Sequence, residues 1–248
     1  MQIEIDKVAL KEYFLHPISK IVGDDASNKG CILELDQKKI QCLCNTTDGS
    51  VILQALLYHT NNISNPINLN IFDLRKFIKI LDCIPETIVK FDINSNNISY
   101  NSPSLKFKFH LMDEGVIKKS VVNTEKINGL FFDTEFTISN EKINEINRLA
   151  TFTEDSNKIY MYCEGGKVFG ELTDKVKPNI DNAVVQLSDG FNGNVFQAIP
   201  LSLDVLRKFS GINFDVINTK INTQTKIFLF ELISDNCSLK YISTALIK

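Results

Sequence analysis

The chain has 248 residues, of which 44% are hydrophobic and 23% are charged, and its formal net charge is −3. This balance is typical of a folded globular protein, and a chain of this length can bury a large core without disulfides or metal ions. No apolar run approaches the roughly 20 residues that a membrane helix needs, and the polar N-terminal residues predict no signal peptide. We therefore expect a cytoplasmic protein, in the host cytoplasm if it is viral, with no membrane partner.

Strand patterns dominate residues 1–111. The clearest is Ser104–Leu111, in which apolar and polar residues alternate strictly, as in a half-buried strand. Two helices are predicted among the strands, at Lys7–Leu15 and Leu74–Cys83, and Asp73 is the expected N-cap of the second. The other predicted strands are Ile32–Leu35, Ile40–Cys44, Val51–Tyr58, Ile67–Ile71, Ile88–Ile93 and Ile98–Tyr100.

Residues 112–132 show no clear period and are predicted to connect two domains of similar size. Beyond them, helices are predicted at Glu141–Thr151, capped by Ser139 or Asn140, and at Leu203–Phe209, capped by Ser202. The strands predicted in this half are Glu135–Ile138, Lys158–Cys163, Lys167–Leu172, Ala183–Leu187, Val195–Ile199, Asn213–Ile217, Lys226–Leu232 and Ser238–Ser243.

The two halves repeat one order of elements: helix, strands, helix, strands. The letters Leu-Arg-Lys-Phe recur in the second helix of each half, beginning at Leu74 and at Leu206. A repeat with so long a period indicates a duplicated domain. The sequence therefore predicts an α+β fold of two similar domains, residues 1–111 and 133–248, joined by the connector 112–132. Each domain would have two helices packed on antiparallel β-sheets.

Each predicted helix has one apolar face and basic residues elsewhere. A single helix of this kind usually has an ordinary solvated face, and acidic residues on the same helices dilute the positive charge. Four such helices in a net-acidic chain nevertheless favour a surface that holds phosphates loosely. The basic residues concerned are Lys7, Lys11, Arg75, Lys76, Lys79, Lys142, Arg148, Arg207 and Lys208.

The sequence shows no pattern of catalytic or metal-binding residues. The six cysteines form no C-x-x-C pair, and we expect free thiols, with Cys42 and Cys44 on one side of a core strand. None of the three histidines has a partner at metal-ligand spacing. No phosphate-binding glycine loop or nucleophile motif occurs. We therefore expect no enzyme activity, no metal and no cofactor.

Three segments resemble the phage-type DNA sliding clamp, a DNA polymerase processivity factor. They are Asn68–Ile80 (NLNIFDLRKFIKI), Ile143–Gly170 and, in its placement, the connector segment Leu111–Glu135. The resemblance implies a DNA-clamp fold and a ring around double-stranded DNA, bound without sequence specificity. It also implies self-association, as a homotrimer or alternatively a dimer, with a replicative DNA polymerase and a clamp loader as partners. The nine basic helix residues would then face the DNA.

The resemblance further implies a hydrophobic pocket beneath the connector, where short peptides of the polymerase and the clamp loader would dock. Packing in the core remains an alternative role for the residues concerned. The pocket residues implied are Val116, Ile117, Val121, Val122, Tyr241 and Leu246.

Two other functions remain open at this point. A β-rich viral structural or receptor-binding protein without DNA function would explain the strands and the acidic charge, but not four helices with basic faces. An enzyme of unrecognised type would need a cluster of titratable residues, which the sequence does not display.

Overall fold

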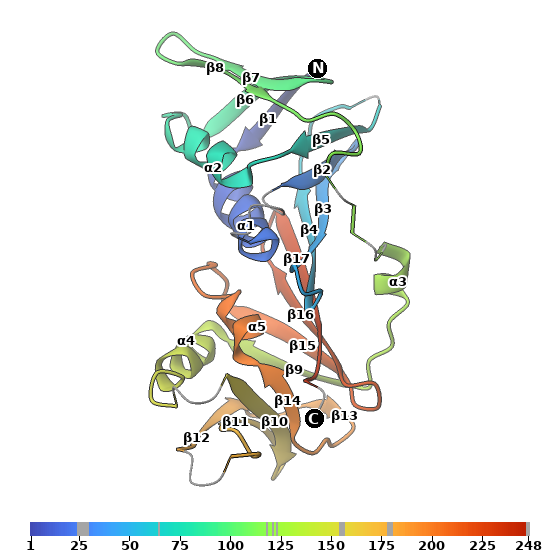
Figure 1. Cartoon of the computed structure of the whole chain (residues 1–248), viewed down its shortest axis with the longest axis vertical. Coiled ribbons are helices and arrows are strands. Elements are labelled where there is room, and N and C mark those ends of the chain that lie inside the picture. Colours follow the sequence, from blue (N-terminus) through green and yellow to red (C-terminus); the bar gives the residue numbers. More distant parts are fainter. Residues whose placement is uncertain are drawn as a thin grey trace. The chain divides into compact units, whose positions relative to one another are not determined.

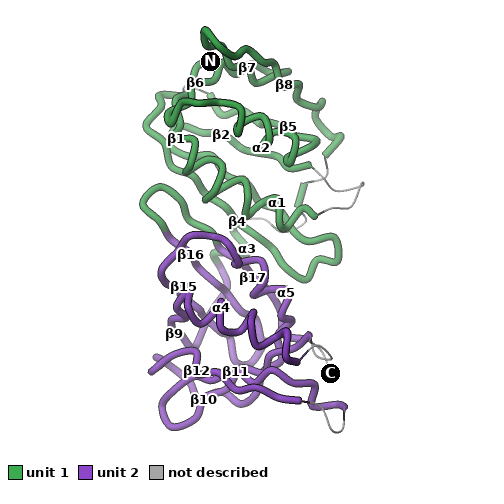
Figure 2. Tube along the Cα trace, turned by 90° about the vertical axis from the view of Figure 1, so that its left-hand side faces the viewer, with its two compact units in different colours: residues 1–128, 234–239 green, residues 129–233, 240–248 purple. Residues whose placement is uncertain are grey.

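The computed structural model describes residues 1–23, 30–63, 65–117, 119–120, 122, 124–153, 157–177 and 181–246. The chain forms two compact units, coloured separately in Figure 2. Unit 1 comprises Met1–Asn128 with Ser234–Leu239, and unit 2 comprises Gly129–Ile233 with Lys240–Lys248. The C-terminal part of the chain therefore contributes residues to both units.

Unit 1 contains two antiparallel sheets with helical segments beside them (Figure 1). The strand orders are β1-β6-β7-β8 and β4-β3-β2-β5. Its elements are β1 (Gln2–Asp6), the π-helix η1 (Ala9–Leu15), α1 (His16–Val22), β2 (Cys31–Leu35), β3 (Lys39–Asn45), β4 (Val51–Tyr58), β5 (Ile67–Ile71), α2 (Leu74–Asp82), β6 (Ile88–Asn94), β7 (Asn97–Asn101), β8 (Lys106–His110) and α3 (Thr124–Asn128).

Unit 2 repeats this arrangement. Its strand orders are β9-β15-β16-β17, with the short β13 beside β9, and β12-β11-β10-β14. Its elements are β9 (Thr134–Ser139), α4 (Asn140–Leu149), β10 (Lys158–Glu164), β11 (Lys167–Leu172), β12 (Ala183–Ser188), β13 (Asn192–Gly193), β14 (Ile199–Ser202), α5 (Leu203–Arg207), β15 (Val216–Asn222), β16 (Ile227–Ile233) and β17 (Cys237–Thr244), of which β17 begins in unit 1.

The two units correspond strand by strand. β1-β6-β7-β8 matches β9-β15-β16-β17, and β4-β3-β2-β5 matches β12-β11-β10-β14. In each unit a helix follows the first strand, and another helix follows the strand that ends the second sheet. This confirms the predicted α+β fold of two similar halves with antiparallel sheets. The predicted strands Val195–Ile199 and Asn213–Ile217 are displaced along the chain, since the structure has β14 and β15 a few residues later.

Burial alternates along the strands as a sheet with one buried face requires. In β6, Val89, Phe91 and Ile93 are buried while their neighbours are exposed. The apolar face of α2 lies on this sheet, and the Phe77 ring centroid is 6.3 Å from that of Phe91 and 5.0 Å from that of Phe109. Each buried phenylalanine contributes about 3–5 kcal/mol relative to alanine, so these contacts fix α2 firmly.

The repeated Leu-Arg-Lys-Phe letters occupy different turns of the two helices. In α2 they form the first turn, because the helix begins at Leu74. In α5 they come one turn later, because that helix begins at Leu203 and ends at Arg207. The repeated letters therefore do not mark the same position in the two helices.

What the letters share is an aromatic contact with the neighbouring sheet. The ring of Phe209 lies 5.1 Å from that of Phe230 and 4.9 Å from that of Tyr241, measured between centroids. This corresponds to the packing of Phe77 on its own sheet. The repeated phenylalanine is thus a buried contact that both halves use.

The first helix is longer than the predicted Lys7–Leu15. Pro17 lacks an N–H and would normally stop a helix, because the carbonyl four residues earlier loses its donor. That carbonyl belongs to Tyr13, and it accepts a hydrogen bond from the thiol of Cys237 at 3.0 Å. The N–H of His16 bonds to the oxygen of Lys11, five residues back, as in a π-helix. The helix therefore widens before Pro17 and continues as α1.

Candidate nucleic-acid interface

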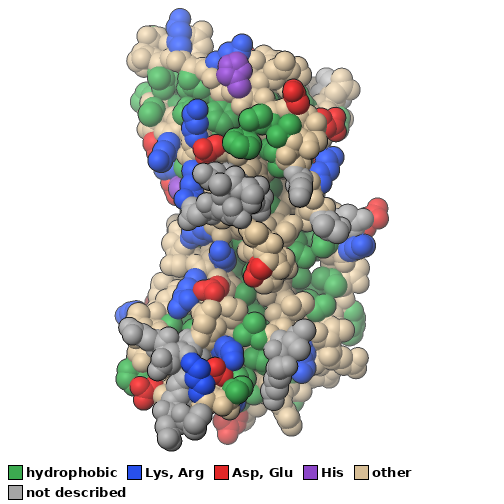
Figure 3. Space-filling model, viewed as in Figure 1, with side chains coloured by type: hydrophobic (Ala, Val, Ile, Leu, Met, Phe, Trp, Pro, Cys, Tyr) green, Lys and Arg blue, Asp and Glu red, His purple; other side chains and the backbone are tan. Residues whose placement is uncertain are grey.

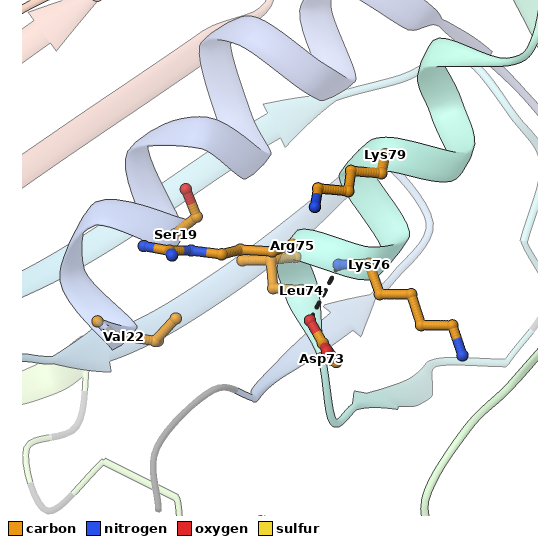
Figure 4. A pocket seen from close by; sticks show the side chains of 8 residues that line it. Ser19, Val22, Asp73, Leu74, Arg75, Lys76 and Lys79 are labelled. Carbon is orange, nitrogen blue, oxygen red and sulfur yellow. Dashed lines mark hydrogen bonds between the residues drawn. The ribbon is translucent and has the colours of Figure 1, made fainter. Parts of the chain in front are cut away.

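A hollow of about 340 Å³ lies between α1 and α2 in unit 1. Figure 4 shows Arg75 and Lys79 extending from α2 toward α1, on the side of Ser19, while Lys76 extends away. Asp73 is the acidic residue of the described lining. The lining residues are Ser19, Val22, Gly23, Asp73, Leu74, Arg75, Lys76 and Lys79.

The local structure of α2 explains why its basic residues are exposed. The Asp73 side chain caps the helix by accepting from the backbone N–H of Lys76 at 2.9 Å, as the sequence predicts. The residues at apolar spacing, beginning with Leu74, are buried against the unit. Arg75, Lys76 and Lys79 therefore point to the solvent side and are exposed.

Two other predicted DNA-facing residues of unit 1 are held by neighbouring groups. The ammonium of Lys11 lies 2.5 Å from Asp82 and 2.9 Å from Glu12. The hydrogen bond to Asp82, followed by that to Glu12, raises the pKa of Lys11 above its usual value. Lys7 donates to the carbonyl oxygen of Ile84 at 2.5 Å, just beyond the end of α2. Both side chains therefore join the first helical segment to the α2 region.

Unit 2 has a corresponding, more open hollow of about 820 Å³ beside α4. Ser139 caps α4 by accepting from the N–H of Lys142, which confirms one of the two predicted caps. The ammonium of Lys142 lies 2.7 Å from Glu145, so its charge is partly neutralised. The hollow is lined by Glu141, Lys142, Asn144, Glu145, Asn147, Arg148, Thr151 and Ser210.

The basic residues around α5 are also balanced by acidic ones. Ser202 caps α5 by accepting from the N–H of Asp204, as predicted for this residue. Arg207 lies 2.8 Å from the carboxylate of Asp204 and donates to Asn157 at 3.0 Å. Lys208 is half-buried at the end of the helix. Figure 3 shows acidic and basic side chains interspersed on the visible face of this unit.

The residues expected to form a peptide pocket differ in exposure and are divided between the two units. Val116 is 55% exposed, Ile117 and Val122 are half-buried, and Val121 lies outside the described residues. These four belong to unit 1. Tyr241 and Leu246 belong to unit 2. Tyr241 has no exposed surface, because it packs against Phe209 in the core, and it therefore offers nothing for a peptide to contact.

Unit 1 exposes two large apolar residues that the sequence analysis missed, one just after β5 and one at the start of the connector. Phe72 follows β5 and is 47% exposed, and Met112 is 38% exposed. The backbone N–H of Met112 bonds to Asn70 of β5 at 2.9 Å, which brings the start of the connector beside that strand. We call Phe72, Met112 and Val116 the connector patch. Strand alternation could have revealed Phe72, because Leu69 and Ile71 are buried and the next residue must face outward.

The cysteines and the other possible metal-binding side chains form no further site in the described residues. All six cysteines are free thiols, as predicted, and Cys42 and Cys44 are buried on the same side of β3. In the described part of the chain, no group of three or more His, Cys, Asp or Glu side chains could hold a metal ion.

Among the same residues, no helix has the length and apolar character needed to span a bilayer.

No protein-family model matches the sequence, and no curated protein matches it significantly. Solved structures match the fold along its whole length. A. fulgidus PCNA, solved with the C-terminal region of FEN-1 bound, superposes with a TM-score of 0.77 at 13% identity, covering 100% of this chain and 98% of that one. Proliferating cellular nuclear antigen from Entamoeba histolytica gives a TM-score of 0.75 at 14% identity, covering 99% and 98%.

A third similar structure is the DNA polymerase III subunit beta from Pseudomonas aeruginosa. Its TM-score is 0.74 at 13% identity, covering 100% of this chain and 66% of that one. The chain has the DNA-clamp fold. The resemblance stated from the sequence is thereby confirmed at the level of the fold, over the full chain.

Proposed function

We propose that this protein is a DNA sliding clamp, a ring-shaped processivity factor that encircles duplex DNA and tethers the replicative DNA polymerase. It would act as a scaffold without catalysing a reaction, in the cytoplasm that holds the replicating DNA. The observation that carries the proposal is the duplicated clamp fold, in which each unit presents helices with basic side chains. A few phosphate contacts give weak, salt-sensitive binding, and a closed ring needs no more, because its topology retains it.

A ring requires two complementary surfaces on each protomer, because head-to-tail contacts must close. Three of the edge strands already form hydrogen bonds with other parts of the chain. The Asn61 side chain bonds the backbone of β1, Met112 bonds β5, and Leu246 bonds β14. β8 in unit 1, and β12 and the two-residue β13 in unit 2, also end their sheets. Unpaired edges present N–H and C=O groups that another strand can use.

We therefore propose that β8 of one protomer pairs with β12 of the next, in a homotrimer or alternatively a dimer. The charges at these edges support the pairing. β8 carries the exposed Lys106, Lys108 and His110, whereas the exposed Asp181 and Asp189 flank β12. Opposite charges across a strand pair stabilise it modestly.

Partner proteins would dock on the connector patch. Its apolar side chains are exposed beside β5, and it belongs to one unit, so it does not depend on a second protomer. A. fulgidus PCNA was solved with a C-terminal region of FEN-1 bound. We propose that short terminal peptides of the polymerase and of the clamp loader bind here. The similar solved structures give no support to a viral structural or receptor-binding function.

The test combines the mass in solution with retention on DNA. Light scattering should give a multiple of the protomer mass, and a clamp loader with ATP should place the protein on nicked circular DNA. After loading, the protein should remain on the circle and slide off once the circle is linearised. A protein that stays monomeric, or that leaves circular and linear DNA equally fast, would contradict the proposal.

A further inference from the structure

One face of the sheet β12-β11-β10-β14 in unit 2 carries a stacked pair of aromatic side chains. In β11 the side chains of Val168 and Leu172 are buried in the core, so Phe169 lies on the opposite, outer face. Its cross-strand neighbour on β10 is Tyr162. The two rings are stacked, with 5.7 Å between their centroids and 23° between their planes. Both side chains are only half-buried, so part of each ring is open to solvent.

The third strand of this sheet extends the apolar surface. Val184 of β12 is 52% exposed. Phe169 pairs with Gln186, and Val184 lies two positions from Gln186 on the same face, so Val184 is a diagonal neighbour of Phe169. We call Tyr162, Phe169 and Val184 the aromatic patch. All three residues come from adjacent strands of one unit (Figure 1), and exposed apolar surface of this kind commonly marks a contact site.

Carboxylates flank the aromatic pair at both ends. Glu164 follows Tyr162 by two positions in β10, and Glu171 follows Phe169 by two positions in β11, so each carboxylate shares the face of its aromatic neighbour. Burial raises the pKa of the Tyr162 hydroxyl, and the charges of Glu164 and Glu171 raise it further, while Lys175 acts in the opposite direction. The surroundings of the patch therefore favour a cation.

The same face already holds one cation in this way. The ammonium of Lys175 lies 4.9 Å from the centroid of the Tyr160 ring and 2.7 Å from the carboxylate of Glu171. Tyr160 and Glu171 are cross-strand neighbours. A tyrosine face and a carboxylate thus bind a basic side chain of this chain. Tyr162 and Glu164 present the same two groups one repeat further along β10.

The nearest lysine does not occupy the second of these places. Lys167 is the cross-strand neighbour of Glu164. Its ammonium donates to the side-chain oxygen of Gln186 at 3.1 Å and lies 3.6 Å from Asp189. The Glu164 side chain is exposed at the end of β10. Its carboxylate can therefore pair with a cation that another molecule brings.

We propose that the aromatic patch is a docking surface for an arginine side chain of a partner protein. The guanidinium would stack on the Tyr162–Phe169 pair and donate to the carboxylate of Glu164, and an apolar neighbour of the arginine would contact Val184. Arginine suits this place better than lysine, because its planar group both stacks on aromatic rings and forms forked hydrogen bonds with a carboxylate. The patch goes beyond the proposed function, since it is a second contact site in the unit that does not contain the connector patch.

The experiment measures peptide binding to the full chain by fluorescence anisotropy. The probe is a fluorescein-labelled octapeptide of alternating arginine and serine, whose arginines lie on one side when it is extended. The matched peptide has citrulline in place of arginine, which keeps the planar head and removes the charge. Phe169→Leu keeps an apolar side chain without a ring, and Glu164→Gln removes the carboxylate charge. Glu4→Gln makes the same charge change on exposed surface of unit 1 and is the control.

The arginine peptide should bind wild-type protein about tenfold more tightly than the citrulline peptide, because both the stacking and the ion pair use the charge. Phe169→Leu should weaken binding of the arginine peptide about threefold, the effect of losing one partly exposed cation–π contact. Glu164→Gln should weaken it by a similar factor, and Glu4→Gln by less than about 1.5-fold.

Several results would overturn the proposal. Equal affinity for the two peptides would show that no guanidinium site exists. An equal effect of Glu164→Gln and Glu4→Gln would show general attraction to an acidic protein. A lower mass of Phe169→Leu in light scattering would show that the patch binds a second copy of this chain instead.

Thermal melting checks that each variant is folded. Glu164 is exposed, so Glu164→Gln should melt like the wild type, and its comparison with Glu4→Gln decides the question even if Phe169→Leu is unstable. The measurement uses neither DNA nor a clamp loader. Its failure would therefore leave the sliding-clamp function untouched, and a protein that is not retained on circular DNA could still bind the arginine peptide.

Discussion

The thiol of Cys237 donates a hydrogen bond to the carbonyl oxygen of Tyr13, at 3.0 Å. The two residues lie near opposite ends of the chain, and the bond satisfies the carbonyl that Pro17 leaves without its usual helical donor. Cys237→Ala should therefore lower the free energy of unfolding by about 1 kcal/mol, the net value of one hydrogen bond. Cys237→Ser keeps a donor and should be less destabilised. Equal destabilisation of the two variants in urea unfolding would show that the contact is packing and not a hydrogen bond.

Cysteine reactivity should follow burial. Burial raises the pKa of the Cys237 thiol to about 12, so almost no thiolate exists near neutral pH. Cys83 is exposed after α2. Alkylation of the native protein, read by mass spectrometry of peptides, should label Cys83 quickly and Cys237 only after unfolding. Labelling of both at the same rate would mean that the last strand opens readily.

The ion pair between Lys11 and Asp82 should stabilise the helical pair of unit 1 without contributing to DNA binding. Lys11→Ala should leave retention on DNA unchanged, and a double-mutant cycle with Asp82→Ala should give a coupling of about 0.5 kcal/mol, because the pair is partly exposed. The pKa of Lys11 is raised in the folded state. The coupling should therefore be complete below pH 10.5 and disappear as the pH rises above that value. If Lys11→Ala is retained less well on DNA, the role of Lys11 is not purely structural.

Glu231 should account for part of the acid sensitivity of unit 2. Burial alone would raise its pKa, but the hydrogen bond from Lys220 and the charges of Lys220 and Lys240 lower it below 4.5. The stabilisation is therefore present above pH 4.5 and is lost as the pH falls through the lower, folded-state pKa. At neutral pH, Glu231→Gln should lower the free energy of unfolding by about 1–2 kcal/mol. In strong acid the same substitution should change it very little.

Glu4 provides the control for this measurement. Its ion pair with Lys90, at 2.9 Å, is exposed on both sides, so Glu4→Gln should change the free energy of unfolding by less than about 0.5 kcal/mol at any pH. Thermal melting across a pH series compares the two variants. A pH-independent destabilisation of Glu231→Gln would mean that packing, and not charge, explains it.

Charge reversal on β8 should disrupt the proposed ring. Lys108→Glu would bring a carboxylate to the edge that faces the acidic ends of β12, so the mass from light scattering should fall toward that of one protomer. Lys90→Glu, on the inner strand β6, should leave the assembly intact. If Lys108→Glu assembles normally, the subunits meet elsewhere. If the wild type is monomeric, the β8 lysines instead protect an unpaired edge.

Local rules in the sequence were enough to predict much of the fold. Asp73, Ser139 and Ser202 each cap the helix that follows, because a short polar side chain before an apolar period meets free N–H groups. Strand alternation placed most strands within a few residues. The first helix was predicted too short, because the partner that satisfies the Tyr13 carbonyl lies 224 positions away and no local pattern reveals it.

The candidate site was less predictable for the same reason. Helical periodicity shows which basic residues leave the apolar face, and Arg75, Lys76 and Lys79 are exposed accordingly. It does not show that Lys11 meets Asp82 on another helix, since that contact is tertiary. Nor does it separate the buried Tyr241 from an exposed pocket residue, because an aromatic residue suits both a core strand and a binding surface.

The division of the C-terminal segment between the two units has a consequence for biosynthesis. Unit 1 is otherwise complete at Asn128, but it also includes Ser234–Leu239. A growing chain emerges from the ribosome in order, so the last strand residues of unit 1 arrive only after most of unit 2 has been made. Nascent chains halted midway should remain susceptible to proteases, and loss of the last dozen residues should weaken the half of the molecule that was made first.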